Sequence, residues 1–195
     1  YSILDQKIID MGAGLERFAW ITMGTPTAYD CCFGPITKNL IQNAGIDLDS
    51  KMISNYFISI AKSLGDSNDI SIARKIAAKQ AGIDENRFNK TIAPLEGIYL
   101  IADHLRTLVF AISDGALPSN VGGGYNLRMI LRRTVATMDR FGWNFDLKEL
   151  VDMHIDYLKS TYPELEETRN DVKTIVGIER ERYNESKTRM KSIAS

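Results

Sequence analysis

The longest apolar helical pattern in this chain covers residues 89–113 and limits the possible folds more than any other feature. Apolar side chains recur there at steps of three and four residues, so they share one broad face of a helix. Neighbouring elements must cover such a face, and we expect this helix to be the buried spine of the fold. Pro94 lacks a backbone N–H and fits only the first turn of a helix, so the helix must begin close to it.

Most of the remaining chain also shows helical patterns, bounded by glycine, proline or capping residues. The expected helices cover residues 15–23, 29–43, 50–64, 69–81, 125–141, 147–161 and 164–195. Residues 3–11 differ, because isoleucine and leucine flank Asp5 and Lys7 and Gly12 follows, which is typical of a strand entering a glycine-rich turn. The expected fold class is therefore mainly α, with a strand-turn-helix unit at the start of the chain.

Length and composition are those of an ordinary globular chain. With 195 residues, 44% of them hydrophobic and 25% charged, the chain suits one domain with a substantial core, together with a piece of a neighbouring domain. The formal net charge is −1, so nucleic-acid binding must come from locally clustered cations rather than from an overall basic field. No apolar run approaches the roughly 20 residues of a membrane-spanning helix, and we expect no membrane partner.

A cluster of glycines and arginines lies in residues 113–133, which read SDGALPSNVGGGYNLRMILRR. Glycines at the start of a helix let backbone N–H groups approach a phosphate, where the helix N-terminus adds partial positive charge. Arg128 and Arg132 are four residues apart and share a helix face, with Arg133 beside them. The segment is suited to binding an RNA backbone. A solvated helix after a flexible loop explains the same residues equally well.

Asn120 precedes these glycines and is the candidate for reading a base. A side-chain amide both donates and accepts hydrogen bonds, so it can discriminate between groups on a base edge. The alternative is structural, because asparagine after Pro-Ser often forms a turn or caps a helix. Both interpretations remain open from the residues alone.

A second candidate site reads DMGAGLER in residues 10–17. Gly12 and Gly14 would let a nucleotide base lie close to the backbone, and Arg17 at a helix start can bind phosphate through two bonds. A simple turn explains the glycines as well. His104 and His154 have no metal-ligand spacing with each other or with the two cysteines, so we expect no metal site.

The amino-acid sequences of these segments resemble those of a known family. DGALPSN followed by GGGYNLRMILRR resembles the tRNA-recognition segment of alanyl-tRNA synthetases, and DMGAGLER resembles the third signature motif of class II aminoacyl-tRNA synthetases. GTPTAYD in residues 24–30 and IADHLR in residues 101–106 also look like alanyl-tRNA synthetase segments and lie between the two in the family's order. The strong resemblance covers about two thirds of the chain, up to Arg133.

The resemblance implies a ligase that activates alanine with ATP and magnesium and transfers it to tRNA(Ala). Arg17 would be the catalytic residue and would contact the terminal phosphates of ATP. Gly12 and Gly14 would border the ATP site, with Gly14 at the adenine base. Asp10 would bind the α-amino group of alanine.

The resemblance also implies contacts with the acceptor stem of tRNA(Ala). The asparagine that matches Asn120 takes part in reading a G·U wobble pair in this family, whose second reader, an aspartate, has no match here. The other expected tRNA contacts are Gly122, Gly123, Gly124, Arg128, Arg132 and Arg133. Gly123 stands where the commoner form has arginine, which removes one expected phosphate contact and is a departure that an archaeal-type branch would explain.

The resemblance implies two regions: residues 1–24 as the C-terminal end of the class II catalytic domain, and residues 25–195 as a helical tRNA-recognition domain, truncated at its C-terminal side. The chain starts with Tyr1 rather than Met and ends at Ser195 inside a helical pattern, so we expect a piece of a longer cytoplasmic protein, inactive when isolated. The first two class II motifs and the editing domain, the one place where zinc would be expected, have no match here. The alternatives are a non-catalytic helical RNA-binding module and a helical protein-interaction domain.

Overall fold

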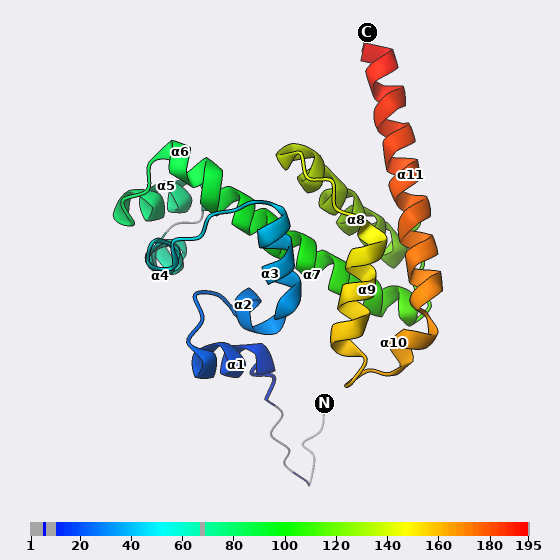
Figure 1. The fold of residues 1–195 in the computed structure, drawn as a ribbon, viewed down its shortest axis with the longest axis horizontal. Coiled ribbons are helices and arrows are strands. Elements are labelled where there is room, and N and C mark those ends of the chain that lie inside the picture. The colour runs from blue at the N-terminus through cyan, green and yellow to red at the C-terminus, as the bar shows by residue number, and fades with distance from the viewer. Residues whose placement is uncertain (1–5, 7–10, 67–68, 195) are drawn as a thin grey trace.

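The computed structural model describes residues 6, 11–66 and 69–194, and Figure 1 shows helices throughout that part of the chain. In chain order the elements are α1 (Leu15–Met23), α2 (Ala28–Cys32), α3 (Pro35–Asn43), α4 (Ser50–Asp66), α5 (Ile70–Gln80), α6 (Glu85–Arg87), the π-helical turn η1 (Phe88–Ile92), α7 (Ala93–Ser113), α8 (Gly122–Phe141), α9 (Leu147–Leu158), α10 (Glu164–Glu167) and α11 (Arg169–Ala194). This agrees with the expected mainly α fold.

The prediction of a strand-turn-helix unit at the start of the chain is wrong. The described residues contain no strand, and Met11 to Gly14 have no regular secondary structure. The rest of the expected strand, residues 3–5 and 7–10, lies outside the described residues. A strand needs a neighbouring strand to pair its backbone N–H and C=O groups, and the described part of the chain offers only helices. The turn and the helix of the unit are present, since Gly14 takes a φ of 74° and α1 covers residues 15–23 as predicted.

The spine prediction for residues 89–113 is confirmed by α7, which runs through the middle of the molecule (Figure 1). One side of α7 contributes to a core cluster with α3, α8, α9 and α11, where Ile101 and Leu105 are fully buried. Its N-terminal part contributes Leu95 and Tyr99 to a second cluster with α4 and α5. Because one helix supplies both clusters, α7 ties the two groups of helices together.

Pro94 explains how α7 begins. The regular α-helix starts at Ala93, so the proline lies in its first turn, where its fixed φ suits a helix. The preceding turn is η1, a π-helical segment, and α6 lies directly before it. Widening the helix by one residue per turn accommodates the proline ring without stopping the chain. The expected helix is therefore present, with its regular part starting four residues later than its first expected residue.

Residues 29–43 form two helices rather than the one expected. Gly34 separates α2 from α3 with a φ of 48°, and Pro35 occupies the first turn of α3. A side chain at residue 34 would meet the Tyr157 hydroxyl, with an added Cβ only 2.9 Å from its oxygen. The break therefore allows α3 to pack closely against α9.

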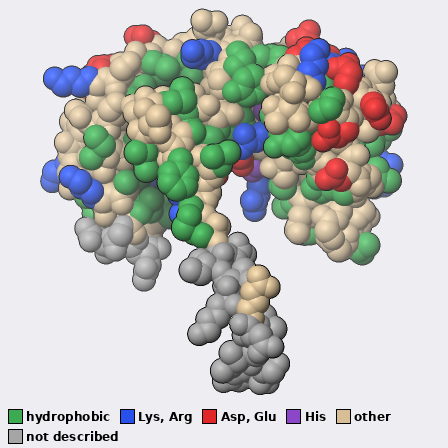
Figure 2. Space-filling view, turned by 90° about the horizontal axis from the view of Figure 1, so that it is seen from below, with side chains coloured by type: hydrophobic (Ala, Val, Ile, Leu, Met, Phe, Trp, Pro, Cys, Tyr) green, Lys and Arg blue, Asp and Glu red, His purple; other side chains and the backbone are tan. Residues whose placement is uncertain are grey.

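The single helix expected over residues 164–195 is likewise two helices, the short α10 and the long α11. Arg169 at the start of α11 donates to Asp152 and Asp156 of α9 and to Glu166 of α10, at distances of 2.6 to 2.9 Å. Lys173 adds a bond of 2.5 Å to Asp152. Figure 2 shows acidic side chains gathered on the side of the molecule that carries these helices. This network fixes α11 against α9 and so determines where the middle of α11 meets α8.

Candidate functional site

The loop of residues 114–121 connects α7 to α8 and carries Asn120. The Ser119 hydroxyl donates to the Val121 carbonyl oxygen at 2.8 Å and accepts from the Val121 N–H at 3.3 Å. The Ser119 N–H also donates to the Gly124 carbonyl oxygen at 2.9 Å. These bonds define the turn, so the direction in which Asn120 leaves the backbone is set by the loop.

The three glycines at the start of α8 differ in backbone conformation and in the space available for a side chain. Gly122 takes a φ of 58°, in the left-handed region that favours glycine. A Cβ at Gly124 would overlap the Leu117 carbonyl oxygen and the Ser119 side chain. A Cβ at Gly123 would meet no atom within 4 Å. Residue 123 could therefore accept a Cβ without moving any neighbouring atom.

Neighbouring residues cover most of the Arg128 side chain. Its side chain is 14% exposed and rests against Glu179 of α11, which is 5% exposed. The Nε and Nη2 atoms of Arg128 donate to the two carboxylate oxygens of Glu179, each at 2.9 Å. Two parallel bonds of this kind form the strongest arginine–carboxylate geometry. Arg128, which was expected to contact a phosphate, is thus hydrogen-bonded to a protein carboxylate.

Asn120 does not cap α8. Val121 occupies the N-cap position and makes no side-chain cap bond. The Asn120 Oδ1 atom instead accepts a hydrogen bond from Arg128 Nη1, and Arg128 Nη2 lies 3.5 Å from the Pro118 carbonyl oxygen. The capping role considered for Asn120 is therefore absent, and its side chain belongs to a cluster with Arg128 and Glu179.

Arg132 and Arg133 lie on different flanks of α8. Arg132 is half-buried near Tyr183 of α11; burial and Asp139 raise the pKa of that tyrosine, and Arg132 partly offsets the rise. Arg133 is exposed near His104 of α7, whose pKa is lowered by burial and further by the Arg133 charge. Arg132 thus lies near α11 and Arg133 near α7, on two sides of the helix that follows Asn120.

Glu179 and Arg182 complete the Asn120 cluster and were missed by the sequence reasoning. Arg182 Nη1 donates to Glu179 Oε1 at 2.6 Å, one turn along α11. Burial raises the pKa of Glu179, but the bonds from Arg128 and Arg182 outweigh burial and hold the pKa below its usual value. The spacing along α11 could have indicated that Glu179 is buried. Glu179 follows Val176 by three residues and so continues the buried face of Val172 and Val176.

The second candidate site lies at the start of α1. The Arg17 N–H donates to the Gly14 carbonyl oxygen at 3.1 Å, and the Arg17 side chain is exposed. Gly12 is exposed with open space around it, while Asp10 lies outside the described residues. α1 contains no buried residue, and its exposed apolar side chains include Leu15, Phe18 and Ile21. The structure therefore brings Gly14 and Arg17 together in one turn and leaves an apolar helix face uncovered.

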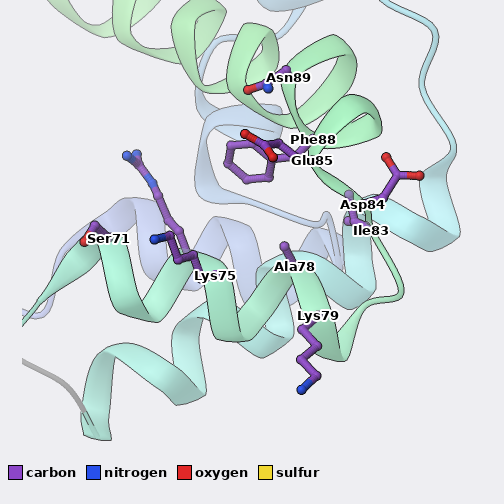
Figure 3. A pocket seen from close by; sticks show the side chains of 10 residues that line it. Ser71, Lys75, Ala78, Lys79, Ile83, Asp84, Glu85, Phe88 and Asn89 are labelled. Carbon is purple, nitrogen blue, oxygen red and sulfur yellow. The ribbon is translucent and has the colours of Figure 1, made fainter.

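Two cavities in the described residues lie away from both candidate sites. One cavity of 680 Å³ lies between α5 and the α6–η1 segment, where Figure 3 shows the Phe88 ring opposite α5 and the Lys79 side chain pointing away. A second, of 450 Å³, lies beside α7 and is lined by Tyr99 and Asp103. Small molecules bind in concave pockets, whereas the Asn120 cluster lies at an open loop.

Within the described residues, no group of three or more His, Cys, Asp or Glu side chains is placed to hold a metal ion. Over that same part of the chain, none of the helices combines the length and apolar character needed to cross a membrane.

The sequence matches the family described as tRNA synthetases class II (A) over residues 1–193, and the chain belongs to that family. Within the family it is similar to archaeal proteins named alanine--tRNA ligase. It is 60% identical over 194 residues to the protein from Nitrosopumilus maritimus, covering all of this chain and 22% of that protein. Identity is 58% to the protein from Cenarchaeum symbiosum, over the whole chain, and 41% to that from Methanosphaera stadtmanae, over 96% of the chain.

The chain spans about a fifth of the length of these curated relatives. The expected relationship to alanyl-tRNA synthetases, including the archaeal branch, is thus confirmed at the level of similarity over the whole chain.

Proposed function

We propose that this chain is part of an enzyme that activates alanine with ATP and transfers it to tRNA(Ala). Residues 25–195 form its helical tRNA-recognition domain, and residues 1–24 belong to the end of its catalytic domain. The observation that carries the proposal is 60% identity over the full chain to an alanine--tRNA ligase. Such similarity favours a synthetase over an unrelated RNA-binding or protein-binding helical module.

The uncovered apolar face of α1 supports the assignment of residues 1–24 to a second domain. Leu15 is 83% exposed and Ile21 is 76% exposed, although both are large apolar side chains. Burying each such side chain contributes about 2 kcal/mol, so a helix of this kind is stable when another surface covers it. A catalytic domain would supply that surface.

Arg17 is the proposed contact to the terminal phosphates of ATP. Its guanidinium is exposed at the start of α1, where the backbone around Gly12 and Gly14 is open or left-handed. A planar guanidinium binds phosphate through two bonds and stabilises the negative charge that develops as pyrophosphate leaves. Asp10 would bind the alanine amino group but lies outside the described residues.

The Asn120 loop and α8 form the proposed contact with the tRNA acceptor stem. Asn120 would read the edge of a G·U base pair, while Arg132 and Arg133 would bind phosphates on either flank. Gly122 and Gly123 would let the backbone approach the RNA, since neither has a neighbour at the position of a side chain. Arg128 contributes to this interface through Asn120, because its guanidinium is already engaged by Glu179.

Activation of alanine by the full-length protein tests this proposal. The full-length enzyme should support ATP–pyrophosphate exchange with alanine, and Arg17→Ala should reduce the exchange rate by about a hundredfold, on the order of 3 kcal/mol. tRNA binding should stay nearly unchanged. Arg189→Ala, which removes an exposed arginine from α11, is the control and should leave exchange intact. Exchange that survives Arg17→Ala would show that another group binds the phosphates.

A further inference from the structure

Glu179 is the residue through which α11 reaches the proposed base-reading side chain. Its carboxylate is 5% exposed and receives bonds from Arg128 Nε and Nη2 at 2.9 Å each and from Arg182 Nη1 at 2.6 Å. Glu179 is 51 residues away from Arg128 in sequence, so this contact depends on how α11 packs against α8. The carboxylate fixes both the position and the plane of the Arg128 guanidinium.

The opposite edge of Arg128 faces the loop. Its Nη1 atom donates to Asn120 Oδ1, and its Nη2 atom lies 3.5 Å from the Pro118 carbonyl oxygen. A guanidinium carries only donors, so the amide atom that it meets must be the oxygen of Asn120. The Asn120 NH₂ group is therefore the end of the amide that remains for a ligand.

We propose that Glu179 is a positioning residue, which acts through Arg128 to orient Asn120 so that it presents N–H donors to the tRNA. This inference rests on the proposed function, because it takes Asn120 as the side chain that reads a base-pair edge. An amide held in this way turns its N–H donors toward the ligand, so it favours acceptor atoms, such as carbonyl oxygens or ring nitrogens, over amino groups. The specificity of the loop thus depends on a carboxylate in the last helix of the chain.

A purely structural role for Glu179 makes a different prediction. Asp152 of α9 offers the comparison, since it also accepts from two cations of α11, Arg169 at 2.9 Å and Lys173 at 2.5 Å. Its hydrogen bonds connect α9 to α11 and do not include Asn120. If both carboxylates only join helices, neutralising either one should affect stability and leave tRNA selection unchanged.

The test compares tRNA(Ala) carrying the G·U pair with the same tRNA carrying G·C, using the full-length enzyme. Glu179→Gln should reduce the ratio of the two alanylation rates about tenfold, because the amide of Asn120 is then free to turn. Alanine activation by ATP–pyrophosphate exchange should not change. Asp152→Asn, the matched control, should lower the melting temperature and keep the ratio.

The double variant with Asn120→Ala separates this inference from the proposed function. If Glu179 acts through Asn120, Glu179→Gln should cause no further loss of discrimination in the Asn120→Ala background. If Asn120→Ala alone keeps the G·U preference, the proposed role of Asn120 fails. If Asn120→Ala abolishes the preference but Glu179→Gln keeps it, only the positioning role fails.

Glu179→Asp covers the case in which Glu179→Gln does not fold. The shorter side chain keeps the charge but cannot make both bonds to Arg128 at the same helix spacing, so discrimination should again fall. Full discrimination in folded Glu179→Asp overturns the proposal. Failure of both variants to fold also overturns it, because the carboxylate would then serve stability rather than tRNA selection.

Discussion

At the scale of single residues, His154 is the most unusual group in the core. It is fully buried, and among the described residues neither ring nitrogen has a hydrogen-bond partner. Burial lowers the pKa of His154 from 6.5 to about 3, and the positive charge of Arg106 acts in the same direction. The imidazole is therefore neutral at neutral pH, packed edge-on against Phe33 at a centroid distance of 6.3 Å.

His154 should make the fold sensitive to acid. The unfolded chain binds a proton at His154 below pH 6.5 whereas the folded chain does not until about pH 3, so stability is lost as pH falls between these values. The loss from this group should approach about 1.4 kcal/mol per pH unit. His154→Leu should flatten the fall in the free energy of unfolding between pH 7 and pH 4.5, measured by urea titration. Parallel curves for the two proteins would show that His154 does not titrate in this way.

At the scale of elements, the start of α8 carries the strongest local constraint. Gly124 packs against the carbonyl oxygen of Leu117, whereas Gly123 faces open space. Sequence patterns predicted a helix here but started it at residue 125, because three glycines look like a loop and their tertiary contacts are invisible in sequence. For the same reason, the sequence did not reveal the break between α2 and α3 at Gly34, where the backbone lies close to Tyr157 of α9.

The two glycines should respond differently to alanine. Gly124→Ala should lower the free energy of unfolding by on the order of 2 kcal/mol, since backbone atoms must move to admit the methyl group. Gly123→Ala should be neutral or add up to about 1 kcal/mol, because alanine has the higher helix propensity and meets no neighbour. Thermal unfolding of the pair provides an internal control, and equal effects at the two positions would contradict the described loop geometry.

At the scale of the whole molecule, the helical class, the central α7 and the relationship to alanyl-tRNA synthetases could be predicted from the sequence. Periodicity and stop signals locate helices because they depend on local spacing. The predicted strand-turn-helix unit was wrong, because the described residues contain no strand and an apolar run before glycine does not reveal whether a partner strand exists. The Arg128–Glu179 pair could not be predicted, because it joins residues that only the packing of α11 brings together. The assigned roles of Arg17 and Asn120 remain predictions.

The most direct test of the proposed role of Asn120 is the ratio of alanylation rates for tRNA(Ala) with a G·U pair and with a G·C pair, measured with the full-length enzyme and with Asn120→Ala. We expect a strong preference for G·U in the natural enzyme and a loss of about 1–3 kcal/mol of that preference in the variant, with alanine activation unchanged. Asn144→Ala, at an exposed asparagine after α8, should behave like the natural enzyme. An unchanged preference in folded Asn120→Ala would contradict base reading by Asn120.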